Sequence, residues 1–205
     1  MFGLPKSTEI NKLLPKKAVF YKFKPNPADR KLFDEQISRL AIVAEISPQT
    51  VSVPASADVS AVYIILVTLK TDECDKKNIV LLSKLIDQRM VFALQYEDTM
   101  RLAVYRAERV LMSERKKFDE WKLNLRGLDL GVVWENIIAE IGGIDLTSGK
   151  GLDDTIVANE RKEKLTKQIA ALEKKAMNER QPRRKWELAN EVKKLRAKLE
   201  EIVNG

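Results

Sequence analysis

The stretch LANEVKKLRAKLEEI, residues 188–202, decides the architecture predicted for this chain. Its apolar residues follow one another at intervals of four, three, four and three positions: Leu188, Val192, Leu195, Leu199 and Ile202. In an α-helix this spacing places the five side chains along one stripe, with Lys, Arg and Glu side chains around it. The sequence therefore predicts a long amphipathic helix whose apolar stripe is covered by another surface.

A second stripe with the same spacing precedes the first and consists of Leu165, Ile169, Leu172 and Ala176. Pro182, which cannot continue a helix, separates the two stripes. We therefore expect a coiled-coil-like helical hairpin over residues 152–205, preceded by a glycine-containing hinge at residues 147–151. Either the two helices cover each other, or a second copy or a partner completes a four-helix bundle. The Leu, Ile and Val residues of the stripes are the candidate partner-binding residues, together with Trp186, because aromatic residues dominate binding hot spots.

The 205-residue chain has no histidine and a single cysteine, Cys74. A Ser–His or Cys–His nucleophile pair cannot be built from these residues, and neither can a zinc site of Cys and His ligands. Cys74 lies among Asp72, Glu73 and Asp75, whose charges would raise the pKa of its thiol. We interpret these acids as the start of a helix rather than a metal site. No cofactor and no metal is predicted.

The net charge of +7 is unevenly distributed: +5 in residues 1–30, −2 in residues 31–150 and +4 in residues 151–205. Positive charge at both ends is compatible with contacts to nucleic acid or to an acidic partner. The first residues lack the pattern of a signal peptide, and the longest apolar run, residues 61–69, is too short to cross a bilayer. We therefore expect a soluble, cytoplasmic protein without membrane contact.

Residues 1–146 are expected to form an α+β body, with a small, mostly antiparallel sheet and helices on one face. Expected strands cover residues 50–53, 61–70, 90–96, 100–108 and 118–125, the third and fourth forming the clearest β-hairpin. Expected helices cover residues 8–13, 26–46, 76–87 and 132–141. Residues 16–24, which alternate lysines with aromatic residues, fit either an edge strand or a nucleic-acid-binding strip.

Several short motifs carry a family resemblance: Gly3-Leu4-Pro5, Ser7-Thr8-Glu9, Asn11-Lys12, Leu14-Pro15-Lys16, the helix–hairpin block of residues 76–105, and the turn ERQPRRK at residues 179–185. Together they resemble a bacterial domain-of-unknown-function family, number 4391 in that series, over most of the chain. The resemblance carries over no catalytic residues. It implies a context near helicases and DNA methyltransferases, in restriction–modification or phage-defence gene clusters.

One catalytic alternative rests on Glu120 and Lys122. On a strand, alternate side chains reach one face, so Glu120 could hold Mg²⁺ while Lys122 steadies the attacking water, as in metal-dependent nucleases. Such a site needs a further acid nearby, and only Asp98 or Glu108 at the β-hairpin could supply it. The competing interpretation is a surface strand that Trp121 anchors in the core.

A second alternative is a DNA-binding module that uses basic residues at two places. The first group is Lys16, Lys17, Lys22 and Lys24, next to Phe20, Tyr21 and Phe23, since cations bind phosphates and rings stack on bases. The second group surrounds the turn of the helical hairpin: Arg180, Arg183, Arg184 and Lys185. Both groups would also serve an acidic protein partner.

The favoured hypothesis is a non-enzymatic accessory or scaffold subunit. Its helical hairpin would dock a protein partner or form a homo-oligomer. The resemblance implies a partner of the helicase or methyltransferase type within a DNA-modification or phage-defence assembly.

Overall fold

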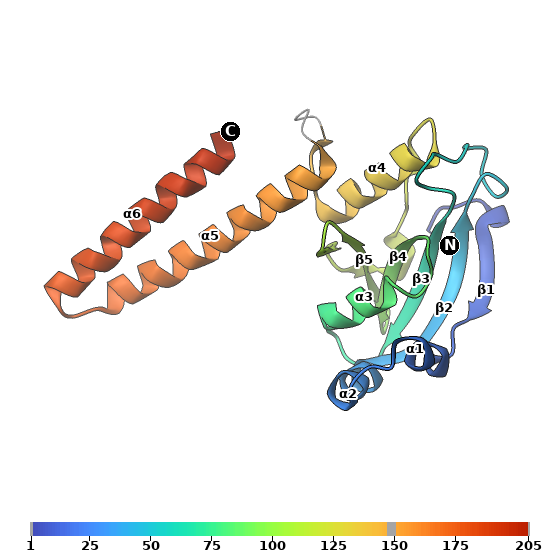
Figure 1. The fold of residues 1–205 in the computed structure, drawn as a ribbon, viewed down its shortest axis with the longest axis horizontal. Coiled ribbons are helices and arrows are strands. Elements are labelled where there is room, and N and C mark those ends of the chain that lie inside the picture. Colours follow the sequence, from blue (N-terminus) through green and yellow to red (C-terminus); the bar gives the residue numbers. More distant parts are fainter. Residues whose placement is uncertain (1, 147–150, 205) are drawn as a thin grey trace. The chain divides into compact units, whose positions relative to one another are not determined.

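The computed structural model describes residues 2–146 and 151–204, and it divides the chain into two compact units, Met1–Ser148 and Gly149–Gly205. We call the first the body and the second the helical hairpin (Figure 1). Except for Gly151, the predicted hinge at residues 147–151 lies outside the described residues. The α+β class, with a mostly antiparallel sheet followed by a helical hairpin, is confirmed.

The body is built on a seven-stranded sheet in which consecutive strands β1 to β6 are neighbours and β7 pairs with β5. The strands are β1 Glu9–Leu13, β2 Ile37–Ile46, β3 Val62–Leu69, β4 Arg89–Tyr96, β5 Thr99–Arg106, β6 Arg109–Met112 and β7 Lys116–Lys117. All neighbours are antiparallel except β3 and β4, which are parallel. A parallel pair requires a crossover, and helix α3, Lys76–Leu82, supplies it.

The hydrophobic core lies on both faces of the sheet. On one face, Val19 of α1 (Lys16–Phe23) and Phe33 of α2 (Pro27–Gln36) share a buried cluster with α3 and with side chains of β2 to β5. Helix α4, Leu130–Gly142, lies on the other face. In β6, Val110 and Met112 pack against the buried cluster, so the side chain of Leu111, which lies between them, points to the opposite face. Gly142 of α4 adjoins Leu111. Each of the two faces of the sheet therefore has helical cover, whereas the sequence predicted helices on one face only.

Helix boundaries in the body follow local side-chain chemistry. Asn26 accepts a hydrogen bond from the Asp29 backbone N–H (2.8 Å), Asp75 accepts one from Lys77 (2.8 Å), and Asp129 accepts one from Val132 (2.9 Å). Each bond satisfies a helix N–H that has no partner within the helix. Helix α4 ends at Gly143, whose φ of +60° suits glycine because it has no Cβ.

The structure corrects five of the expected elements. The helix expected over residues 26–46 ends at Gln36, and β2 follows, because residues 37–46 are apolar on both faces as in a central strand. Residues 9–13 form β1 rather than a helix, and residues 16–24 form α1 rather than an edge strand. Neither residues 50–53 nor residues 118–125 form a strand; the second segment begins with a 3-10 turn, Phe118–Glu120.

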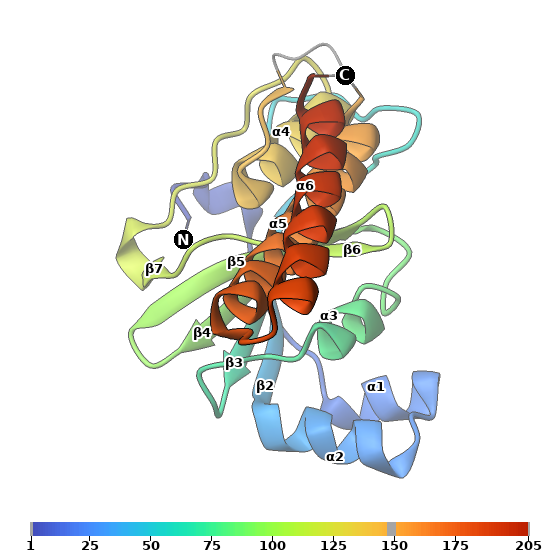
Figure 2. The same ribbon diagram turned by 90° about the vertical axis from the view of Figure 1, so that its left-hand side faces the viewer.

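The helical hairpin consists of α5, Leu152–Asn178, and α6, Pro182–Asn204. The two helices pack side by side in opposite directions (Figures 1 and 2). They are joined by a turn of three residues, 179–181, and Pro182 begins α6 as a first-turn proline. None of the described helices carries an apolar run long enough to cross a membrane.

Candidate partner-docking surface

The predicted apolar stripes of α5 and α6 are where these helices meet. Ile169 and Val192 are the most buried stripe residues, with 7% and 9% of their surface exposed. The remaining stripe residues are half-buried: Leu165, Leu172, Ala176, Leu188, Leu195, Leu199 and Ile202. Because the stripes are occupied by helix–helix packing, the surface left for a partner lies on the flanks of the hairpin and at its tip.

Glu179 organises the turn at the tip of the hairpin. Its Oε1 accepts hydrogen bonds from the backbone N–H groups of Arg180 (2.9 Å) and Gln181 (3.0 Å), and its Oε2 lies 3.7 Å from Nε of Arg184. The bond from Gln181 is the main cause that lowers the pKa of Glu179 below its ordinary value, with the bond from Arg180 and the Arg184 charge adding to it. The tip is thus a defined turn rather than an unstructured link.

The predicted basic cluster at the tip is exposed, and part of its charge is compensated. Arg183 pairs with Glu187 of the same helix (3.4 Å), and Arg184 lies within ion-pair distance of Glu179. Within the described part of the chain, neither Arg180 nor Lys185 forms an ion pair. Two cations at the tip therefore remain available to an anionic partner.

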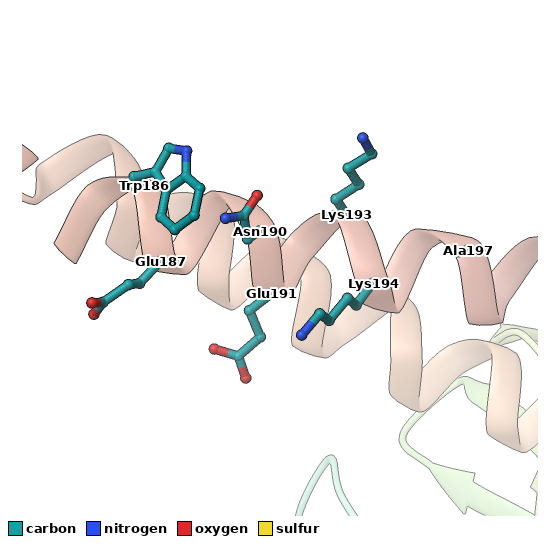
Figure 3. A pocket seen from close by; sticks show the side chains of 7 residues that line it. All are labelled: Trp186, Glu187, Asn190, Glu191, Lys193, Lys194 and Ala197. Carbon is teal, nitrogen blue, oxygen red and sulfur yellow. The ribbon is translucent and has the colours of Figure 1, made fainter. Parts of the chain in front are cut away.

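Trp186 lies on the outer face of α6 with 68% of its surface exposed. It lines a shallow hollow of about 740 Å³ together with Glu187, Asn190, Glu191, Lys193, Lys194 and Ala197. Figure 3 shows the indole beside Asn190, with the Glu187 and Glu191 carboxylates pointing to one side and Lys193 to the other. These side chains diverge from a single helix, so the hollow offers a contact surface and not a convergent catalytic site.

A second hollow of about 700 Å³ runs along one flank, between α5 and α6. We call it the hairpin groove; its lining is Glu173, Ala176, Met177, Lys185, Ala189, Val192, Lys193 and Arg196. Met177 is 80% exposed, which is unusual for a side chain of this size. Arg196 donates to Glu173 Oε1 across the groove (2.6 Å). Sequence reasoning missed the groove, because its lining is divided between two helices and neither helix alone contains the whole pattern.

The nuclease alternative loses its structural premise. Glu120 lies in a 3-10 turn, and Glu120 and Lys122 are both exposed around Trp121, whose Nε1 donates to the Met100 carbonyl (3.0 Å). Of the candidate further acids, Asp98 directly precedes β5 and Glu108 lies beyond the opposite end of that strand. Among the described residues, no group of three or more acids or Cys side chains is placed to hold a metal ion.

The lysines of residues 16–24 lie on α1, where the body occupies part of their charge. Lys16 pairs with Asp34 (3.1 Å), and Lys22 donates to the Leu85 carbonyl (2.7 Å). Phe20 packs edge-on against Phe33, with 5.3 Å between the ring centroids, and Tyr21 is exposed. In the predicted strip, Lys17, Lys24 and the ring of Tyr21 therefore remain accessible to a nucleic acid. The sequence indicated a larger number of accessible cations and rings.

The body has one hollow near Cys74, of about 440 Å³, lined by Leu69, Asp72, Glu73, Cys74, Asp75, Lys76, Leu94, Arg101 and Met112. Burial, with a smaller contribution from the Asp75 charge, raises the pKa of the Cys74 thiol to about 11, so the thiol is protonated at neutral pH. Nε of Arg101 is buried without a hydrogen-bond partner among the described residues. Carboxylates and cations share this hollow, so it favours neither sign of ligand.

The chain thus combines an α+β body with a hairpin of two helices, and the hairpin groove lies between those helices. The chain belongs to the family described as domain of unknown function DUF4391, which matches residues 2–199. No curated protein and no solved structure matches the chain.

Proposed function

We propose that this protein is a non-enzymatic accessory subunit that docks another protein, or a second copy of itself, through its helical hairpin. The observation that carries the proposal is the exposure of Met177 and Trp186, 80% and 68%, on helices whose stripes already cover each other. Aromatic and methionine side chains are enriched at protein interfaces. Exposing two of them on one hairpin favours a binding surface over a purely structural element.

The resemblance suggests the setting for this docking. We propose a cytoplasmic assembly that modifies or translocates DNA, in which a helicase or a methyltransferase is the partner. Lys193 lines both hollows of α6, and Arg180 and Lys185 extend the positive charge toward the tip. A partner with an acidic contact surface would match this charge.

The DNA-binding alternative is kept as the second candidate, because exposed cations lie on α1 and at the hairpin tip. Its signature would be an affinity for duplex DNA that falls steeply with salt. The Mg²⁺-dependent nuclease with Glu120 and Lys122 is the weaker candidate, because Glu120 lies outside any strand. A plasmid-cleavage assay of the Glu120→Gln variant tests it directly.

Photo-crosslinking in cells tests the docking proposal. A photo-reactive phenylalanine analogue replaces Trp186 on the hairpin, or Leu128 of the body as a matched control, since Leu128 is 90% exposed. We expect the hairpin position to yield a discrete crosslinked species of defined mass, identified by mass spectrometry, and the Leu128 position to lack it. Equal crosslinking from both positions, or none from Trp186, contradicts the proposal.

A further inference from the structure

We propose that the hairpin groove binds one amphipathic helix of a protein partner, with an apolar face and acidic flanks. The inference rests on the proposed docking function and specifies the chemistry of the occupant. Its starting point is the composition of the groove: an apolar floor, bordered on the α6 side by cations. Helix-in-groove binding is a recurring mode of recognition that uses this combination.

The floor suits the apolar face of a helix. Ala176 and Ala189 are small, so a helix backbone can approach closely, and Met177 is a flexible side chain that adapts to the apolar residues of a partner. Val192 is already 91% covered and closes the bottom of the groove. From Lys185 to Arg196 the groove follows α6 for about 16 Å, at about 1.5 Å per residue, which matches roughly three turns of a bound helix.

The border of the groove selects the charge of the occupant. Lys185 and Lys193 form no ion pair within the part of the chain that the structure describes, whereas Arg196 is neutralised by Glu173 at 2.6 Å. The groove therefore presents two uncompensated positive charges beside apolar surface. Carboxylates on the flanks of a bound helix would pair with both.

The same charges disfavour a second copy of this chain in the groove. A two-fold interface places the same patch on both sides, so Lys185 and Lys193 would face the same two lysines of the other copy. Like charges at an interface oppose association and help to exclude wrong partners. The positive charges of Lys185 and Lys193 therefore attract an acidic helix and repel a second copy of the chain.

A binding titration with synthetic peptides tests the inference on the full-length chain. The probe is a fluorescein-labelled 16-residue peptide with Leu and Ala on one helical face and Glu on both flanks. Two comparison peptides have the same composition with the apolar residues scattered around the helix, or Lys in place of every Glu. We expect fluorescence anisotropy to show binding of the first peptide, and at least tenfold weaker binding of the other two.

Variants of the protein separate the groove from general attraction to a basic chain. The double variant Lys185→Glu/Lys193→Glu should weaken binding of the acidic amphipathic peptide by about tenfold or more, because two attractions become repulsions. The matched control is Lys175→Glu/Lys198→Glu, which changes net charge equally at exposed positions outside the groove, and should change affinity less than twofold. The variant Met177→Gln should weaken binding of the peptide, whereas the variant Met177→Leu, which keeps an apolar side chain, should bind it like the unchanged protein. Circular dichroism confirms that each variant retains its helices.

Three outcomes overturn the inference: equal loss in the control pair, equal binding of the scattered peptide, or no binding at all. A homodimer seen by light scattering that blocks the peptide would identify a second copy as the occupant; docking would then stand and the acidic helix would fall. If the peptides fail while Trp186, which lies outside the groove, still crosslinks to another protein, docking stands and the groove is not the site of an acidic helix. If both experiments fail, the docking function falls as well.

Discussion

The body and the hairpin bury their apolar residues in different ways. In the part of the chain that the structure describes, the largest fully buried side chains all lie in the body, among them Phe33, Phe92 and Leu102. In the hairpin, the stripe residues between α5 and α6 are mostly half-buried. Two helices alone have no second layer on their flanks, so apolar side chains such as Met177 remain in contact with water. The body is therefore stabilised by its own core, whereas the hairpin leaves part of its apolar surface exposed to solvent.

The largest effect of a single substitution is expected in the core of the body. Phe92→Ala removes a ring that is 1% exposed and leaves a cavity between the sheet and the helices, so we expect a loss of about 3–5 kcal/mol in the free energy of unfolding of the body. Hydrogen exchange followed by mass spectrometry should show faster exchange in β2 to β5. Amides of residues 152–204 should keep their protection, because the hairpin is a separate compact unit.

Faster exchange in both units of the Phe92→Ala protein would show that they unfold as one. The hairpin would then owe its stability to the core of the body and not to the packing of its own helices. Urea unfolding followed by tryptophan emission supplies the size of the effect. A Trp186→Phe background restricts that signal to Trp121 and Trp134 of the body.

The hairpin is expected to break separately and at a lower cost. Leu195→Asp places a carboxylate among the half-buried stripe residues, so we expect a loss on the order of 2–3 kcal/mol for the pairing of α5 and α6. Helices in proteins owe most of their stability to the packing of an amphipathic face, so protection of residues 152–204 from exchange should fall. The body should remain folded.

Ala197→Asp is the matched control for Leu195→Asp, because Ala197 is exposed on the outer face of the same helix. It introduces the same charge two positions away and should leave exchange within the hairpin unchanged. Equal effects of the two substitutions would mean that the stripe does not hold the helices together. The helix itself would then be sensitive to any added acid.

How much the sequence predicts differs between the same two regions. The hairpin follows from its pattern, because the stripe keeps one period over several turns and Pro182 marks the break. In the body, Phe33, Ile37 and Leu40 fit a helical period as well as a change from helix to strand. Only pairing of β2 with β1 and β3 decides between them, and that pairing depends on residues far along the chain. The β4–β5 hairpin was predicted correctly because its signals are local.

The candidate site shows the same limit. The stripes are periodic within one helix, so sequence reasoning finds Ile169 and Val192, but it leaves open whether the two stripes cover each other. The hairpin groove depends on how Met177 of α5 lies relative to Ala189 of α6, a register that no pattern within either helix specifies. Glu120 and Lys122 were read as strand residues because alternation over three positions is too short to distinguish a strand from a 3-10 turn.

The smallest effect is expected at the hairpin tip, where the stability of the turn depends on hydrogen bonds and charge rather than on a core. The pKa of Glu179 is lowered in the folded chain, so its carboxylate stabilises the turn at pH values above the ordinary glutamate pKa. This stabilisation is lost as the pH falls through the lowered pKa, when the carboxylate takes up a proton. Glu179→Gln should slightly lower the melting temperature of the hairpin at pH 7, measured by circular dichroism, and make no difference at pH values below that pKa. Glu191→Gln, on the exposed outer face of α6, removes a carboxylate that does not cap the turn, so a pH-dependent effect of equal size there would contradict the role assigned to Glu179.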